Sequence, residues 1–200
     1  MGEIDMTEMV KLRNKFLDQE KAIGTRITYT DLFVFTVAKA LKENPVINSS
    51  LIDNEIKTWE DINIGVAVAL DEGLIVPVVK GADKKSLTEI SKTTKALAEK
   101  ARAGKLASDE VSGGTFTISN LGAVGAGYRF ETVIINQPES AILGTGAITE
   151  RAVVRDGQIV IRPIMTYYFT YDHRVIDGAV AAKFMAGMIE LLENPQLLLV

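Results

Sequence analysis

The chain has 200 residues, of which 47% are hydrophobic and 24% charged, and it carries a net charge of −4. These values describe one ordinary globular domain with enough apolar side chains for a single core. The interspersed charges form no basic stripe, so we expect no nucleic-acid partner. The lack of cysteine excludes disulfides, thiolate metal sites and a cysteine nucleophile.

The N-terminal residues lack the basic and apolar regions of a signal peptide. No apolar stretch reaches the about 18 residues that a membrane span requires. We therefore expect no membrane partner and a cytoplasmic location, or the mitochondrial matrix if the source is a eukaryote.

The apolar residues follow two periods along the chain. A helical period recurs in four segments, one of which begins with a capping box from Ser86 to Glu89 and ends at Gly104. Strand-like runs occur between these helices and also as hairpins, with turns predicted at 53–54 and 156–157. Pro77 favours an edge position for its run. We expect helices over 7–21, 31–43, 87–104 and 179–193, strands over 62–70, 74–79, 115–119 and 141–148, and hairpins over 51–59 and 152–171.

These elements predict the fold class. Strands in hairpins and strands separated by helices together favour a mixed sheet with packed helices, an α/β chain of the α+β kind, over a doubly wound parallel sheet. We find no internal repeat or linker and expect residues 1–200 to form one domain. Asp177 is suited to cap the helix over 179–193, and an apolar tail over 197–200 follows that helix.

The single histidine is the most informative residue for function. His173 lies in the run Tyr171-Asp172-His173-Arg174-Val175-Ile176-Asp177-Gly178, just beyond the second arm of the long hairpin. A lone histidine is more often structural, but the acidic residues on both sides and the following glycine favour proton transfer. With an unperturbed pKa of about 6.5, imidazole both accepts and donates a proton near neutrality.

Other catalytic classes lack their motifs. The glycine-rich stretches 122–127 and 144–146 match neither nucleotide-binding fingerprint, and no GxSxG pentapeptide supports a serine hydrolase. One histidine with nearby carboxylates does not reproduce a zinc spacing, so we expect no metal. What remains is a histidine that acts as base for a substrate thiol, with a hydroxyl at a strand end to bind the oxyanion of an acyl transfer.

Several motifs together resemble the catalytic core of the dihydrolipoyl acyltransferases of 2-oxo acid dehydrogenase complexes, which share their fold with chloramphenicol acetyltransferase. The resemblance covers nearly the whole chain. Its most specific part is HRVIDG, beginning at His173, with FTISNLG upstream, so that Ser119 precedes His173 by 54 residues. Further matching runs are Asn44-Pro45, Asn48-Ser49-Ser50, Asn63-Ile64-Gly65-Val66-Ala67-Val68, Gly73-Leu74-Ile75-Val76-Pro77-Val78 and Ala141-Ile142-Leu143-Gly144.

The resemblance implies catalytic roles for three residues. His173 is expected to be the general base for the thiol of coenzyme A or, in reverse, of dihydrolipoamide, and Ser119 to donate a hydrogen bond to the oxyanion. Asp177 corresponds to the acidic partner that organises the site, although a helix cap alone also explains an aspartate there. Coenzyme A is then a substrate, and lipoamide is carried by a separate lipoyl domain. Residues expected to bind substrate or coenzyme A are Asn120, Leu121, Gly122 and Arg174.

The resemblance also implies partners. The family forms homotrimers with active sites between subunits, so His173 and Ser119 are expected to come from different chains. Trimers assemble into hollow cubes or dodecahedra through C-terminal apolar residues, a role that fits Leu197 to Val200 unless the tail folds back on its own subunit. The other partners are lipoyl domains and the dehydrogenase components. The family's lipoyl and peripheral subunit-binding domains have no counterpart within this sequence.

Two departures from the family pattern concern the site. The basic segment that precedes the strand at 3–5 in the family is missing, and with it an arginine near the active-site aspartate. Either the sequence is trimmed or Asp177 has another partner. Glu131-Thr132 stand where many relatives have a proline, which affects the loop over 123–132 and its substrate contacts.

We therefore expect an acyltransferase that moves an acyl group between dihydrolipoamide and coenzyme A through a direct ternary complex. Leu121 favours an acetyl or branched-chain group over a succinyl group. One alternative is a small-molecule O-acetyltransferase on the same fold, which the FTISNLG match disfavours. A second is a non-catalytic scaffold of the complex core, which has no need of His173 or Ser119.

Overall fold

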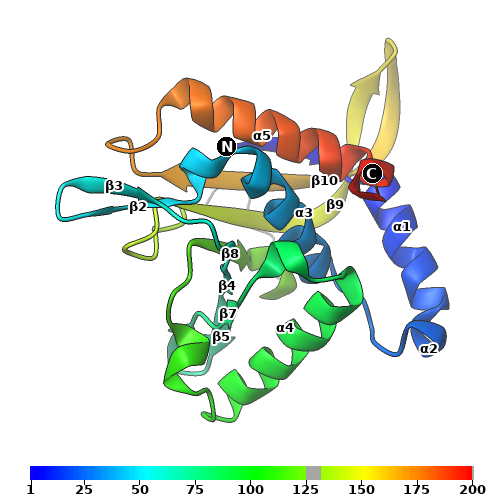
Figure 1. The fold of residues 1–200 in the computed structure, drawn as a ribbon. Coiled ribbons are helices and arrows are strands. Elements are labelled where there is room, and N and C mark those ends of the chain that lie inside the picture. Colours follow the sequence, from blue (N-terminus) through cyan, green and yellow to red (C-terminus); the bar gives the residue numbers. More distant parts are fainter. Residues whose placement is uncertain (125–131, 200) are drawn as a thin grey trace.

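Residues 1–124 and 132–199 are described by a computed structural model, shown in Figure 1. The predicted features at Glu131 and Val200 lie outside these residues. The strands are β1 (Gly2–Asp5), β2 (Ser49–Ile52), β3 (Glu55–Thr58), β4 (Ile64–Val66), β5 (Val68–Leu70), β6 (Gly73–Ile75), β7 (Val78–Val79), β8 (Phe116–Asn120), β9 (Ala141–Arg155) and β10 (Gln158–Tyr171). The α-helices are α1 (Thr7–Asp18), α2 (Glu20–Ile23), α3 (Tyr29–Glu43), α4 (Leu87–Arg102) and α5 (Gly178–Glu193). The 3-10 turns are η1 (Pro45–Ile47), η2 (Ala82–Lys84), η3 (Ser108–Val111), η4 (Leu121–Val124) and η5 (Pro195–Leu199).

The described strands form one mixed sheet and two ribbons. The sheet has the order β1-β10-β9-β8-β4-β7, in which β8 runs parallel to both β4 and β9 while the other pairs are antiparallel. The ribbons are β2–β3 and β5–β6. The mixed sheet with packed helices confirms the predicted fold class.

Helices cover one face of this sheet. In Figure 1, α3 and α5 lie in front of the strands, and α4 lies beside the end formed by β4 and β7. The main core fills the space between these layers. Phe184 of α5 lies between Phe116 of β8 and Phe169 of β10, with ring centroids 6.0 and 5.2 Å away. Burial of such rings is worth about 1.5–3 kcal/mol each, so these contacts fix α5 on the sheet.

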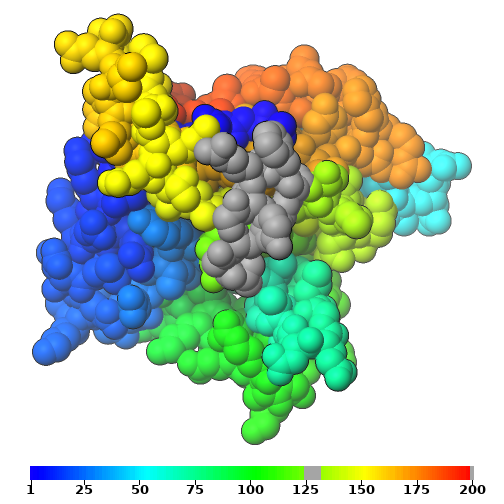
Figure 2. Space-filling model, turned by 180° about the vertical axis from the view of Figure 1, so that it is seen from behind, coloured from blue at the N-terminus to red at the C-terminus, as the bar shows by residue number. Residues whose placement is uncertain are grey.

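The opposite face carries a smaller apolar cluster made of Val133, Ile142 and Tyr168, which we call the rear cluster. Figure 2 shows the molecule from behind, where the hairpin of β9 and β10 (yellow) stands out from the body. The outer part of this hairpin exposes Val154, Ile159 and Ile161.

Most predicted signals for element ends are confirmed. The capping box is present, with the Glu89 N–H donating to Ser86 Oγ and the Ser86 N–H to the Glu89 carboxylate. Gly104 follows α4 with a positive φ of 63°, a conformation that glycine adopts without strain. Both hairpin turns lie where predicted, and β7, which follows Pro77, is an edge strand.

Four predicted boundaries are wrong. The helix over 7–21 is interrupted at Gln19, between α1 and α2. The run over 62–70 divides into β4 and β5, and the run over 74–79 into β6 and β7, because only β4 and β7 join the main sheet. The strand over 141–148 and the first hairpin arm are one strand, β9, whose polar residues 149–151 pair with β10 beyond the body of the sheet.

None of the described helices is both long and apolar enough to cross a membrane.

Candidate active site

His173 lies in a tight loop between β10 and α5. The loop is anchored on both sides, because the Asp172 N–H donates to the Ser140 carbonyl at 2.8 Å and Ile176 is fully buried. The ring of His173 packs against Tyr171 with centroids 5.8 Å apart, and the residue is exposed. A fixed loop thus presents the imidazole to a group outside the subunit.

Arg174 is paired within the same loop. Its Nη2 donates to Asp172 Oδ2 at 2.6 Å and its Nε to Oδ1 at 3.0 Å. These hydrogen bonds hold the pKa of Asp172 below its usual value. An exposed ion pair contributes little to stability, but it ties down the loop that carries His173. That Arg174 binds substrate stays a prediction.

Asp177 stands at the N-cap position of α5 but does not cap the helix with its side chain. Its carbonyl accepts from the Ala181 N–H at 2.9 Å, whereas its carboxylate forms no capping hydrogen bond. The predicted N-cap position is therefore confirmed, but the exposed carboxylate supplies no capping hydrogen bond. Among the described residues it also has no salt bridge, so it is available to a partner.

Ser119 lies near the end of β8, on the rear face of the sheet. It pairs with Gly144 of β9, which pairs with Tyr168 of β10. Directly opposed residues on neighbouring strands share a face, so Ser119 lies on the side of Tyr168, a member of the rear cluster. The preceding residue, Ile118, points the other way and is fully buried in the main core.

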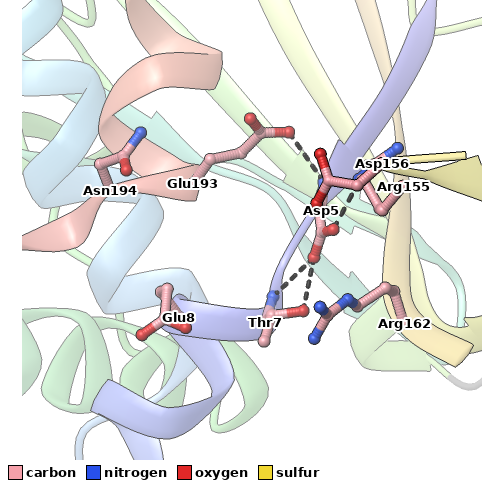
Figure 3. Close-up of a pocket in the computed structure, with 8 residues that line it drawn as sticks. All are labelled: Asp5, Thr7, Glu8, Arg155, Asp156, Arg162, Glu193 and Asn194. Atoms are coloured by element: carbon pink, nitrogen blue, oxygen red, sulfur yellow. Dashed lines mark hydrogen bonds and ion pairs between the residues drawn. The ribbon is translucent and has the colours of Figure 1, made fainter. Parts of the chain in front are cut away.

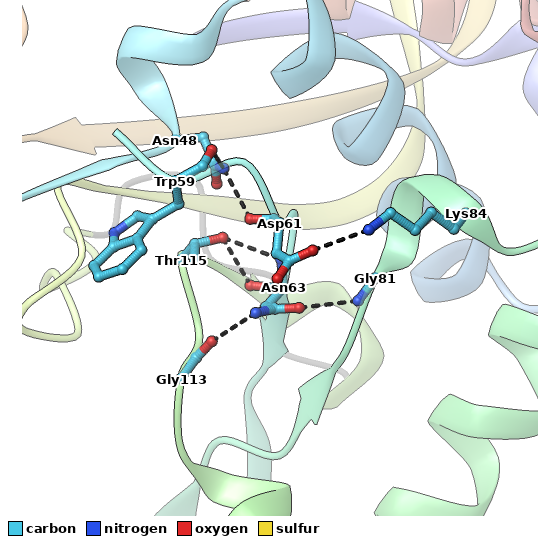
Figure 4. A network of polar contacts seen from close by, with 8 residues as sticks. All are labelled: Asn48, Trp59, Asp61, Asn63, Gly81, Lys84, Gly113 and Thr115. Carbon is cyan, nitrogen blue, oxygen red and sulfur yellow. Dashed lines mark hydrogen bonds and ion pairs between the residues drawn. The ribbon is translucent and has the colours of Figure 1, made fainter. Parts of the chain in front are cut away.

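Asn63 fixes the segment that leads into β8 (Figure 4). Its Oδ1 accepts from the Gly81 N–H at 2.9 Å and its Nδ2 donates to the Gly113 carbonyl at 3.0 Å. Its backbone carbonyl accepts from the Thr115 N–H at 2.8 Å. One residue therefore joins three segments and sets where β8 begins.

The three predicted binding residues after Ser119 all have structural contacts. Asn120 Nδ2 donates to Thr30 Oγ1 at 2.9 Å, and Leu121 packs against the rear cluster. Gly122 lies so close to β9 that a Cβ would overlap the Gly146 carbonyl, so only glycine fits there. Their predicted contacts with a ligand stay predictions.

Ser119 and His173 do not meet within one chain. Ser119 is level with Tyr168 in the sheet, whereas His173 follows the end of β10 at Tyr171. This offset is roughly 10 Å along the strands and about 10 Å across two strand spacings. Because no hydrogen bond spans such a distance, the two side chains do not contact each other within one chain.

A pocket of about 310 Å³ lies beside the end of β8, lined by Arg13 and Tyr29 on one side and by Asn120 and Gly146 on the other. The guanidinium of Arg13 lies over the Tyr29 ring, 4.8 Å from its centroid. Burial raises the pKa of Tyr29, and the neighbouring Arg13 offsets part of that rise. The buried Nε of Arg13 has no hydrogen-bond partner among the described residues. The pocket thus offers a cation and an aromatic ring to a ligand.

Glu139 is a buried acid beside the same strand. Thr117 Oγ1 donates to its Oε2 at 2.6 Å, and Asn136 Nδ2 donates to its Oε1 at 3.2 Å. Burial raises the pKa of Glu139 to about 7, although both hydrogen bonds act to lower it. Thr117 precedes Ser119 by two residues on the same face, so Glu139 supports the strand that carries the predicted oxyanion donor.

A larger pocket, of about 380 Å³, lies near the hairpin tip, at the opposite end of β10 from His173 (Figure 3). Two of its charged groups form a pair, since Arg155 lies 3.2 Å from Asp5, and the Asp5 N–H donates to Glu193 at 3.1 Å. Burial raises the pKa of Asp5, but hydrogen bonds from Thr7 and the Arg155 cation lower it overall. We assign this pocket a structural role.

In residues 1–124 and 132–199, no group of three or more His, Cys, Asp or Glu side chains is placed to hold a metal ion.

Four residues near the predicted site were not foreseen from the sequence: Arg13, Tyr29, Thr30 and Glu139. The first three lie 89 to 106 positions before Ser119, and only the folded chain brings them to the end of β8. The sequence around Glu139 contains a signal for a buried acid, because this glutamate stands just before the small and apolar run at the start of β9.

Comparison with known proteins identifies the family. The whole chain, residues 1–200, matches the model of the 2-oxoacid dehydrogenases acyltransferase (catalytic domain). The acetyltransferase component of the Bacillus subtilis pyruvate dehydrogenase complex is 44% identical over 100% of this chain, and the succinyltransferase component of the Rickettsia bellii 2-oxoglutarate dehydrogenase complex is 44% identical over 99%. The chain spans 45% and 49% of these relatives, about half of their length.

Solved structures agree with this assignment. The cubic core of a pyruvate dehydrogenase multienzyme complex (37% identity) and the Azotobacter vinelandii dihydrolipoamide acetyltransferase (36%) each superpose with a TM-score of 0.93, covering 100% of this chain and 82% of theirs. Chloramphenicol acetyltransferase, at 15% identity, covers 96% of this chain and 86% of its own with a TM-score of 0.60, and shows a common fold. The fold is thus that of the chloramphenicol acetyltransferase class. The chain belongs to the acyltransferase family of the 2-oxo acid dehydrogenase complexes, as its motifs predict.

Glu139→Gln is expected to change how stability depends on pH. In the folded protein the pKa of Glu139 is about 7 against an ordinary value of 4.5, so between these pH values the folded chain holds a proton that the unfolded chain releases. The free energy of unfolding therefore falls as pH rises through this window, by up to about 3 kcal/mol. Glutamine does not titrate, so the variant should be comparable to the wild type near pH 4.5 and more stable above pH 7.

Urea unfolding at pH 5 and pH 8, at one protein concentration, measures this difference. Glu55→Gln, on the exposed strand β3, is the matched control and should follow the wild type at both pH values. Identical pH dependence in Glu139→Gln and the wild type would show that the buried acid does not titrate in this window.

Proposed function

We propose that the protein transfers an acyl group between dihydrolipoamide and coenzyme A as the catalytic core of a 2-oxo acid dehydrogenase complex. The observation that carries the proposal is the placement of two motif residues: His173 is exposed on an anchored loop, and Ser119 lies one residue before the end of β8 on the rear face. The Azotobacter vinelandii relative is described through the role of a serine, a histidine 52 residues later and an asparagine four residues further on in its catalytic mechanism. Ser119, His173 and Asp177 stand at corresponding spacings of 54 and four residues.

The proposed reaction needs no covalent bond to the protein. His173 accepts the proton of the coenzyme A thiol, whose pKa near 8.5 leaves little thiolate at neutrality. The thiolate sulfur attacks the thioester carbonyl of acyl-dihydrolipoamide, and Ser119 donates a hydrogen bond to the oxyanion that forms. The intermediate collapses, the carbon–sulfur bond to lipoamide breaks, and the leaving thiolate takes the proton from His173. Asp177, exposed and four residues after His173, is the acid proposed to organise the loop.

The geometry supports an active site shared between copies of the chain. Within one subunit Ser119 and His173 are too far apart to contact each other; His173 is exposed and Ser119 is half-buried on the rear face. A second copy that approaches the rear face can bring its own His173 to Ser119. We propose a homotrimer with one such site at each interface.

The pocket of Arg13 and Tyr29 is the proposed entrance for coenzyme A. It lies on the α3 side of the end of β8, where it is lined by Asn120, and it holds an arginine stacked on an aromatic ring. The Ser119 side chain faces the other side of the sheet, so the thiol arm of coenzyme A would pass the end of β8 to reach it. Guanidinium recognises phosphate oxygens through a planar set of donors, and aromatic rings stack on a purine. Coenzyme A carries both groups at the end away from its thiol. The lipoyl group is proposed to come from a separate lipoyl domain.

We propose that trimers assemble further, in keeping with the cubic core among the similar structures. The C-terminal turn η5 folds back on its own subunit, where Leu198 is buried and Lys39 Nζ donates to the Leu197 carbonyl at 2.9 Å. Most of the Leu198 side chain is thus covered by its own subunit. An apolar groove of about 230 Å³ lined by Leu12, Phe16 and Phe35 adjoins the turn, and it is the proposed contact with a second copy.

The remaining proposals concern the cell and the rest of the complex. We propose that residues 1–200 are the core domain, that the lipoyl and peripheral subunit-binding domains lie outside this sequence, and that the dehydrogenase components are partners. A cytoplasmic location accords with the bacterial relatives. Relatives with acetyl and with succinyl specificity are equally similar, so we propose no single acyl group.

His173→Ala and Ser119→Ala are expected to keep the assembly and lose activity. Loss of the base should lower kcat by at least about 100-fold, and loss of the oxyanion donor by about 100- to 1000-fold. The assay follows acyl transfer from acetyl-coenzyme A to dihydrolipoamide, with chloramphenicol as a parallel acceptor. Ser108→Ala, on an exposed 3-10 turn, is the control. Full activity of His173→Ala would exclude the proposed mechanism, and transfer to chloramphenicol alone would favour an O-acetyltransferase.

Mixed assemblies test whether the site is shared. When His173→Ala and Ser119→Ala chains are co-expressed with different tags, random mixing leaves about one quarter of the interfaces with both native residues. We expect activity of about one third of the wild type in doubly purified trimers and about one quarter in large mixed assemblies, although each variant alone is inactive. The mass in solution should be a multiple of three times 21.8 kDa. Mixed assemblies without activity would place both residues in one subunit.

Arg13→Gln is expected to weaken binding of coenzyme A by about tenfold in KM, because a charge-assisted contact with phosphate is lost. The kcat value should stay near that of the wild type. Pantetheine, which has the thiol but lacks the nucleotide, is the discriminating substrate, and Arg13→Gln should not change its KM. Lys95→Gln, an exposed cation on α4, is the control. An equal effect on pantetheine would show that Arg13 does not bind the nucleotide.

A further inference from the structure

The side chain of Asn120 forms two internal hydrogen bonds directly after Ser119. Its Nδ2 donates to Thr30 Oγ1 at 2.9 Å, and its Oδ1 accepts from the Ala123 N–H at 3.2 Å. The second bond closes the 3-10 turn η4, and the first ties the end of β8 to α3. Both ends of the amide are thus engaged in holding the chain around Ser119.

Thr30 belongs to a helix end that is itself firmly held. Thr28 and Asp31 form a reciprocal capping box at the start of α3, with distances of 3.2 and 2.8 Å. Asp31 is buried and also accepts a hydrogen bond from Thr94 of α4. The first turn of α3 is therefore fixed to a second helix, and Thr30 offers Asn120 a rigid anchor.

The contact acts on Ser119 only through the backbone. Asn120 pairs with Thr145 of β9, and successive residues of a strand point to opposite faces, so Asn120 turns toward α3 while Ser119 turns to the rear. Thr30 lies on the α3 side and Ser119 on the other. Displacement of the strand end would move the Ser119 hydroxyl without breaking any bond that the hydroxyl itself makes.

We propose that Thr30 is a positioning residue for acyl transfer, which through Asn120 holds the Ser119 hydroxyl where the oxyanion forms. This inference rests on the proposed function. It assigns the Asn120 amide the role of holding the strand end, besides lining the pocket proposed for coenzyme A. An oxyanion donor is effective only when it is placed to within a fraction of an ångström, so a small shift of the strand end is costly in rate.

Thr30→Val keeps the shape of the side chain and removes its hydrogen-bonding oxygen. We expect kcat to fall by about tenfold, the scale of one lost hydrogen bond, with the KM values for coenzyme A and dihydrolipoamide within about twofold of the wild type. Thr30→Ser retains the hydroxyl and should restore kcat. Asn120→Ala breaks the same bond from the other side and should lower kcat to a similar extent. Thr93→Val, which removes an exposed hydroxyl on α4, is the control.

A double-variant cycle shows whether the effect passes through Ser119. In a Ser119→Ala background, Thr30→Val should change kcat by less than about twofold, because the group it positions is gone. A fully additive loss overturns the inference, as does a rise in KM with unchanged kcat, which would make Thr30 a ligand contact. Full activity of Ser119→Ala overturns the proposed function as well, so the two failures are distinguishable.

Discussion

The register of β8 between β4 and β9 is the constraint on which the site depends. Side chains alternate along a strand, so Ile118 enters the main core and Ser119 faces the rear. A slip of one residue would bury the serine and expose the isoleucine. Asn63 fixes where the strand begins, and Gly122 permits the close turn against β9 where it ends.

Local signals predicted much of this arrangement. The capping box before α4, the turns of both hairpins and the position of His173 beyond β10 depend on neighbouring residues, and each lies where expected. Contacts between distant segments were not predictable in this way. The hydrogen bond from Asn120 to Thr30 joins residues 90 positions apart, and the division of the run over 62–70 depends on which of its parts finds a partner in the main sheet. Asp177 is a local signal that was only partly sufficient. Its residue type fits a helix N-cap, but the direction of its carboxylate depends on the conformation of the folded loop.

The polar groups of β8 are unusual for a central strand and have a common effect. Thr117 donates to the buried Glu139, and Asn120 donates to Thr30, so the strand is tied on one side before Ser119 and on the other side after it. A buried acid costs stability at neutral pH, and apolar residues would fill the same space without that cost. Hydrogen bonds to such a buried acid are directional, however, whereas apolar contacts are not. Hydrogen bonds on both sides of one residue therefore define its position more closely than packing alone.

The segment 139–140 links the two halves of the proposed site. Glu139 holds Thr117 and so the strand of Ser119, while the next residue, Ser140, accepts the N–H of Asp172 and so anchors the loop of His173. If the catalytic pair is shared between copies, these two residues serve different active sites, one on each side of the subunit. A shift of the segment would then change the position of Ser119 in one site and of His173 in the next site at the same time. In such an assembly, the geometry at neighbouring sites would be coupled through adjacent residues within a single chain.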